Sequence, residues 1–245
     1  NVDSVTFRNG STDADGGAIY NYGGNLYLAK CNFTDNKALN GIGGAVYSTV
    51  NTIANNSIFS NNEALRGGAI GGGAVITDSI FSNNTAAEEG GAIYSEFTTI
   101  MTVSGSTFTG NKATDGGAIY RGGSPDGSDT EISITNSTFT RNSATGSGGA
   151  VHNEGMVNID QATFTGNTAG AGGAIGNSND LIVSNALFNE NTSETNGGAV
   201  DNNAGLIMLN STFTGNAAAG SGNAIYSAAA GDLLLANSIL TGNLK

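Results

Sequence analysis

Apolar residues recur at every second position in short segments that repeat along the whole chain. Typical segments are Ile132-Ser-Ile, Val157-Asn-Ile and Leu181-Ile-Val, in which both outer residues are apolar. A period of two is typical of a β-strand with one buried face, and no segment has the ~3.6-residue period of an amphipathic helix. The pattern therefore predicts a chain built from short strands.

A Phe-x-x-Asn element follows each of these segments. Successive copies begin 22 to 31 residues apart, with a mean near 26, and variant copies begin at Phe7 and Leu240. The complete copies begin at Phe33, Phe59, Phe81, Phe108, Phe139, Phe164, Phe188 and Phe213. Their asparagines are Asn36, Asn62, Asn84, Asn111, Asn142, Asn167, Asn191 and Asn216.

A Gly-Gly-Ala-Ile/Val element lies between successive Phe copies, from Gly16 to an altered copy at Gly222. Two independent motifs keep phase over nine repeats, which indicates a tandem structural repeat. One repeat contains a strand, a corner, a strand with Phe inward, a corner at Asn and a Gly-rich strand. This predicts an all-β fold, a right-handed parallel β-helix (solenoid) of about nine coils, with three short strands and ~26 residues per coil.

Like residues should stack on like in such a solenoid. The Phe column should form a buried aromatic ladder, and the corner asparagines should hydrogen-bond to the coils on either side. The glycine pairs should supply positive φ or close packing where the chain turns.

The repeats cover residues 1–245, so we expect a single β-helix domain, which we interpret as a segment of a longer protein. The longest interval contains residues 121–131 with the sole proline, and it predicts a protruding loop. No capping element is evident at either end of the sequence. The ends are therefore expected to stack on other coils or on other copies.

Charge excludes some classes of partner. The chain has eight Lys and Arg and 20 Asp and Glu, which gives a net charge of −12, so nucleic acid is not an expected partner. No apolar run approaches the ~20 residues of a membrane-spanning helix, which argues against direct membrane insertion.

The alternation of Gly-Gly-Ala-Ile and Phe-x-x-Asn resembles the repeats of the chlamydial polymorphic outer membrane proteins and of bacterial and archaeal adhesin-like β-helix surface proteins. The resemblance covers essentially the whole chain. It implies an extracellular, secreted or autotransported rod on a microbial cell surface, non-enzymatic and structural or adhesive. The implied partners are a host or neighbouring cell surface, matrix or glycan.

Enzymes on β-helices, such as those that act on polysaccharides, are a third interpretation. They need clustered carboxylates near cations and long loops, whereas the cations here are dispersed, so no catalytic residue is predicted. His152 replaces Tyr in a column after the Gly-Gly-Ala motif, and we interpret it as a member of that column. The column is also a candidate contact strip for sugars or proteins: Tyr20, Tyr47, Tyr94, Tyr120 and Tyr226.

Three acidic segments are weak candidates for Ca²⁺, which prefers several oxygen ligands. They contain Asp13 and Asp15, Glu88 and Glu89, and Asp126 and Asp129. None has the spacing of a ligand loop, so we interpret them as solvated turns and expect no cofactor or metal.

Outward threonines beside the Phe column suggest an alternative function. They form a lattice of methyl and hydroxyl groups that resembles the Thr-x-Thr face of β-helical antifreeze proteins, and so predict ice binding as the alternative to adhesion. Thr is also simply a good residue for an exposed strand. The four pairs are Thr107 and Thr109, Thr138 and Thr140, Thr163 and Thr165, and Thr212 and Thr214.

Overall fold

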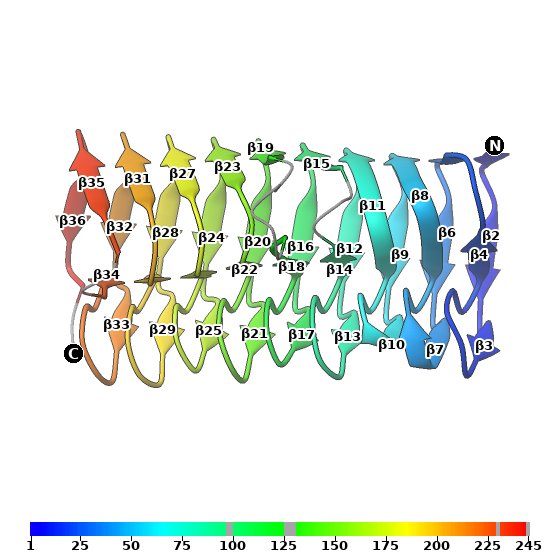
Figure 1. Cartoon of the computed structure of the whole chain (residues 1–245), viewed down its shortest axis with the longest axis horizontal. Coiled ribbons are helices and arrows are strands. Elements are labelled where there is room, and N and C mark those ends of the chain that lie inside the picture. The colour runs from blue at the N-terminus through cyan, green and yellow to red at the C-terminus, as the bar shows by residue number, and fades with distance from the viewer. Residues whose placement is uncertain (97–99, 125–130, 229–230, 244–245) are drawn as a thin grey trace.

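The chain winds into an elongated rod in which each coil lies against the next, with the N- and C-termini at opposite ends (Figure 1). The computed structural model describes residues 1–96, 100–124, 131–228 and 231–243. Every paired strand runs parallel to its neighbours, in three sheets. The predicted fold class is confirmed: an all-β parallel solenoid of about nine turns.

The first sheet carries the Phe-x-x-Asn motifs and is called the Phe sheet. It has ten strands that follow one another in chain order. They are β2 (Thr6–Arg8), β6 (Asn32–Thr34), β9 (Ile58–Ser60), β12 (Ile80–Ser82), β16 (Thr107–Thr109), β20 (Thr138–Thr140), β24 (Thr163–Thr165), β28 (Leu187–Asn189), β32 (Thr212–Thr214) and β36 (Ile239–Thr241).

The second sheet begins after the Asn corner and is called the short-strand sheet, because most of its nine strands have two residues. Its strands are β3 (Ser11–Thr12), β7 (Lys37–Ile42), β10 (Glu63–Arg66), β13 (Thr85–Ala86), β17 (Lys112–Ala113), β21 (Ser143–Ala144), β25 (Thr168–Ala169), β29 (Thr192–Ser193) and β33 (Ala217–Ala218).

The third sheet, called the wide sheet, has 17 strands because most coils contribute two. The first group follows the Gly-Gly motifs: β4 (Ile19–Asn21), β14 (Ile93–Ser95), β18 (Ile119–Arg121), β22 (Val151–Asn153), β26 (Ile175–Asn177), β30 (Val200–Asn202) and β34 (Ile225–Ser227). The second group precedes the Phe sheet: β1 (Val2–Asp3), β5 (Leu26–Ala29), β15 (Met101–Ser104), β19 (Ile132–Thr135), β23 (Val157–Asp160), β27 (Leu181–Ser184), β31 (Leu206–Leu209) and β35 (Leu233–Ala236). In two coils the groups merge, as β8 (Val46–Asn55) and β11 (Ile70–Thr77).

The Phe column forms the predicted aromatic ladder in the core. Rings from Phe7 to Phe213 stack with centroids 4.6 to 4.9 Å apart and interplanar angles of at most 8°. From Phe33 to Phe213 these residues are 0% exposed. Burying each such ring contributes on the order of 1.5–3 kcal/mol. Inward Ile and Val from the wide sheet fill the remaining core.

The corner asparagines form the predicted hydrogen-bonded ladder. The Asn142 Nδ2 donates to the Asn167 Oδ1 at 3.0 Å and to the Phe108 carbonyl at 3.0 Å. Its Oδ1 accepts from the backbone N–H of Asn111 at 3.0 Å and from the Asn111 Nδ2 at 2.9 Å. Each amide therefore joins two neighbouring coils at a buried corner where a backbone turn would otherwise leave polar groups unpaired.

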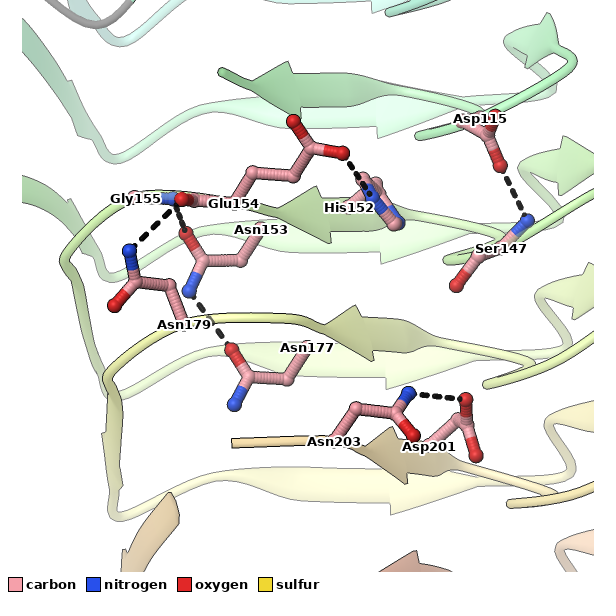
Figure 2. A network of polar contacts seen from close by, with 10 residues as sticks. All are labelled: Asp115, Ser147, His152, Asn153, Glu154, Gly155, Asn177, Asn179, Asp201 and Asn203. Atoms are coloured by element: carbon pink, nitrogen blue, oxygen red, sulfur yellow. Dashed lines mark hydrogen bonds and ion pairs between the residues drawn. The ribbon is translucent and has the colours of Figure 1, made fainter. Parts of the chain in front are cut away.

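A second amide ladder lies at the wide-sheet corner of the C-terminal half. The Asn153 Nδ2 donates to the Asn177 Oδ1 at 2.8 Å (Figure 2). The Asn177 Nδ2 donates in turn to the Asn202 Oδ1 at 2.7 Å. All three side chains are buried. This ladder was missed from the sequence, although each Asn stands two residues after the Val or Ile of a Gly-Gly-Ala motif. The recurrence of Asn at this position could have predicted the second ladder.

The glycine pairs form narrow arches between coils. The first glycine has positive φ, as in Gly148 at 69°, which confirms the expected left-handed conformation. The second glycine faces the next coil: a Cβ on Gly149 would collide with the carbonyl oxygen of Gly173. Close approach of the coils therefore requires the absence of a side chain at this position.

Candidate functional site

The outward threonines of the Phe sheet lie in register over three consecutive coils. Thr107 pairs with Thr138, and Thr138 pairs with Thr163; the second column pairs Thr109 with Thr140 and Thr165 in the same way. The next coil breaks the array with Leu187 and Asn189, after which Thr212 and Thr214 resume it. All eight are partly exposed. The predicted lattice is therefore contiguous over three coils, and its ice-binding role stays a prediction.

The tyrosine column is assembled on the outward side of the wide sheet, but its members differ in exposure. Tyr20 is 53% exposed, whereas Tyr94 and Tyr120 are 9% and 7% exposed. Glycine stands in the column in two coils, at Gly71 and Gly176. Tyr47 and Tyr226 are half-buried. A contact role for the column stays a prediction, and the exposed ring surface for it lies mainly at Tyr20.

A charged cover explains the burial of Tyr94. The Arg66 guanidinium lies 5.6 Å from the Tyr94 ring centroid, a cation–π distance. Arg66 Nε also forms ion pairs with Glu88 at 2.8 Å and Glu89 at 3.2 Å. Burial raises the pKa of the Glu89 carboxyl, and the Arg66 charge opposes that rise. The side chain of one coil thus covers the ring of the next.

His152 occupies the column as the sequence predicts, and its ring stacks on Tyr120 with centroids 5.3 Å apart. The His152 Nε2 lies 3.4 Å from the Glu154 Oε1 (Figure 2). This hydrogen bond is the main reason that the pKa of Glu154 is lowered. Burial is the main reason that the pKa of Tyr120 is raised.

Asp201 lies two coils beyond His152, with Gly176 between them in the column. Its side chain is buried and accepts a hydrogen bond from the Asn203 Nδ2 at 3.0 Å (Figure 2). Burial raises the pKa of the Asp201 carboxyl, while the Asn203 hydrogen bond opposes the rise. Asp201 therefore carries an electrostatic cost at neutral pH.

A His, a Glu and a Tyr in contact could in principle transfer protons. The geometry here favours a structural role, because His152 and Tyr120 are both buried and the His152 Nε2 faces Glu154. A general acid or base must reach its substrate, and these rings present almost no surface to one.

Three of the four described acidic residues in the weak Ca²⁺ candidates have other partners. The Asp15 Oδ1 accepts the Ile42 N–H at 2.8 Å, and Glu88 and Glu89 pair with Arg66. Among the described residues, no group of three or more His, Cys, Asp or Glu could hold a metal ion. Asp126 and Asp129 lie outside the described residues.

Most of the predicted loop at residues 121–131 also lies outside the described part of the chain. Its first residue is not on the surface: Arg121 ends β18 and is 0% exposed. The Arg121 Nη1 donates to the carbonyls of Glu96 and Gly122, both at 2.7 Å. Because its guanidinium is buried and binds backbone carbonyls, Arg121 belongs to the coil and not to a protruding loop.

Comparison with known proteins matches five segments of the sequence to one repeat family. The model of the Chlamydia polymorphic membrane protein repeat matches residues 30–49, 78–96, 105–120, 136–154 and 210–228. The chain carries polymorphic membrane protein repeats. Each matched segment contains one Phe-x-x-Asn corner and the glycine arch after it, so one repeat corresponds to the Phe-sheet strand, the short strand and the first wide-sheet strand of a coil. No solved structure matches the chain.

Proteins with polymorphic membrane protein repeats are outer-membrane or surface-associated and generally non-enzymatic, which agrees with the sequence interpretation at that level. The chain is consistent with the passenger domain of a surface protein or autotransporter. Within the described residues, no helix is long and apolar enough to cross a bilayer.

Proposed function

We propose that this chain is an adhesive segment of an extracellular surface rod, which holds a host or neighbouring cell, matrix or glycan through its outward columns. The observation that carries the proposal is that each polymorphic membrane protein repeat separates residues that hold the coil together from residues that lie on its surface. Its Phe, Asn and Gly positions and the Ala, Ile and Val side chains of the core are committed to the interior or to the arches, whereas the residues that alternate with them on the strands are partly or fully exposed. The outward positions are thus free to differ from coil to coil without disturbing the stack.

Repetition supports this role physically. Parallel strands place equivalent outward residues of successive coils ~4.8 Å apart, so one face offers many weak contacts at once. Linked weak contacts gain strength because each later contact forms intramolecularly. No member of the stack has to bind tightly for the rod to adhere.

The test is retention of beads coated with the chain on cells and on matrix, against beads coated with an inert protein. A variant lacking residues 124–130 tests the loop, and Tyr20→Ser tests the exposed end of the tyrosine column. We expect the parent to be retained and at least one variant to be retained less. Background retention of the parent would remove the adhesive role and leave a spacer.

Ice binding remains a second candidate because the Thr pairs of three consecutive coils are in register. Thermal hysteresis and ice-crystal shaping should be measured on the parent and on a Thr138→Lys/Thr163→Lys variant. Ice binding predicts that the parent is active and the variant inactive. A parent that neither shapes ice nor shows hysteresis rules this function out.

A further inference from the structure

A groove of about 670 Å³ crosses the outward face of the wide sheet near its C-terminal end. Its floor is formed by the strands β23, β27, β31 and β35 and the turns before them.

The floor is apolar where the same column is polar in the three coils before it. Ile182, Ile207 and Leu234 stand in register and are 41%, 36% and 54% exposed. Their counterparts in the three preceding coils are polar: Asn158, Ser133 and Thr102. Met156, 40% exposed, extends the apolar surface at one end. A contiguous exposed apolar surface of this kind marks an interaction site.

The charges that line the groove are all negative. Glu131, Asp180 and Asp232 precede strands of the wide sheet and are exposed, and no Lys or Arg is among the lining residues. The carboxylates of Asp180 and Asp232 make no ion pair or side-chain hydrogen bond within the part of the chain that the structure describes. Two neighbouring carboxylates without counterions favour a cationic occupant.

Gly205 separates Asp180 from Asp232 along this column and creates a notch between them. The Asp180 Oδ1 lies over Gly205, at a place where a Cβ on residue 205 would collide with it. The Asp180 carboxylate therefore lies in the notch, on the side toward Asp232, and one ammonium or guanidinium group can contact both carboxylates along this edge.

The second amide ladder holds the backbone beneath this notch. The Asn153 Nδ2 donates to the Asp180 carbonyl at 3.3 Å, and the Asn177 Nδ2 donates to the Gly205 carbonyl at 3.2 Å. The Asn202 Nδ2 lies 3.4 Å from the Asp232 carbonyl. The acidic edge is therefore supported by a buried network, and little conformational entropy is lost when a partner binds to it.

We propose that the groove binds an extended peptide segment of another protein in which apolar side chains alternate with Lys or Arg. The apolar side chains pack on Ile182, Ile207 and Leu234, and one cation lies against the Asp180 and Asp232 carboxylates beside the notch. Anionic lipid, nucleic acid and acidic glycan are repelled by the carboxylates. A second copy of this chain is disfavoured because each copy carries a net charge of −12. Binding in this groove does not depend on the adhesive function proposed above.

The test uses fluorescence anisotropy with short labelled peptides and the full chain. The probe alternates Lys and Leu; the matched peptides alternate Glu with Leu and Lys with Ser. We expect the Lys-Leu peptide to bind, the Glu-Leu peptide not to bind, and the Lys-Ser peptide to bind at least tenfold more weakly. Failure of the Lys-Leu peptide to bind, or equal binding of Glu-Leu, overturns the proposal.

Variants locate the binding on the rod. Asp180→Asn/Asp232→Asn should weaken Lys-Leu binding at least tenfold at low salt and remove most of its salt dependence, and Ile207→Asn should weaken binding to a similar extent. The controls are Asp78→Asn and Ile80→Asn, an exposed carboxylate and an exposed apolar residue on another part of the rod. Circular dichroism and thermal unfolding establish that each variant is folded.

Equal binding by the parent and the groove variants would show that the peptide binds elsewhere and would overturn the proposal. Sedimentation of the parent and of Ile207→Asn completes the test. If the parent self-associates and Ile207→Asn does not, the occupant is a second copy, and the peptide proposal is wrong.

Discussion

The corner asparagines from Asn62 to Asn216 use the whole hydrogen-bonding capacity of their side chains. In Asn142 both donors of the amide nitrogen and both acceptor positions of the amide oxygen are occupied. Aspartate at this position lacks the two donors, and glutamine places its amide one carbon too far from the backbone. The repeat therefore requires Asn itself, and a buried donor left unpaired costs ~1–3 kcal/mol.

Asp201→Asn should stabilise the protein at neutral pH, because it removes a buried charge and keeps an oxygen for the Asn203 hydrogen bond. The folded pKa of Asp201 is raised, so the charged form destabilises the fold above that pKa. The cost declines as pH falls through the folded pKa and disappears below the unfolded value of ~3.9. The gain in free energy of unfolding should follow the same course in urea titrations from pH 7 to pH 3. An equal gain at both pH values contradicts the assignment.

At the scale of single elements, the arches set the distance between coils. Gly149→Ala should destabilise the fold by about 3 kcal/mol or more, because its Cβ meets the carbonyl oxygen of Gly173. Gly166→Ala is the matched control: its φ is +62°, and its Cβ would touch nothing closer than the Arg141 Cγ at 3.7 Å. It should cost only about 1–2 kcal/mol from the left-handed backbone. Urea unfolding of both variants checks the order, and equal costs would contradict it.

Elements that recur in phase could be predicted from the sequence, because a residue repeated in nine coils meets the same surroundings each time. The Phe ladder and the Asn corner were found in this way. Features set by one or two coils were not: β8 and β11 run without a corner, and the ring of Tyr94 is covered by Arg66 of the preceding coil. The apolar groove was missed because its column keeps no single residue type: it is apolar at Ile53 and Val75, polar from Thr102 to Asn158 and apolar again from Ile182.

At the scale of the whole molecule, each coil contacts only its neighbours, so stability should depend on adjacent pairs. Phe139→Ala should cost about 3–5 kcal/mol through lost burial and a cavity. Phe139 and Phe164 stack at 4.9 Å, so the double variant should cost less than the two single variants together, by about 0.5–3 kcal/mol.

Phe59 and Phe188 lie in coils that are far apart and provide the control for this coupling. Their double variant should equal the sum of its single variants to within about 0.5 kcal/mol. The measurement is the free energy of unfolding in urea for each member of both cycles. Equal coupling in the two cycles would mean that the rod responds as one unit rather than coil by coil.

Coil length varies along only one part of each turn. From the Phe to the following glycine pair the spacing is 8 to 10 residues in every coil, whereas from the glycine pair to the next Phe or its variant Leu240 it ranges from 14 to 23. The second stretch contains the wide-sheet corner, which is absent in β8 and β11 and longest after β18. Foreign sequences grafted at this corner would project from a single edge of the rod at regular intervals. An engineered series of epitopes or enzymes could therefore be displayed on this rod at spacings set by the number of coils between them.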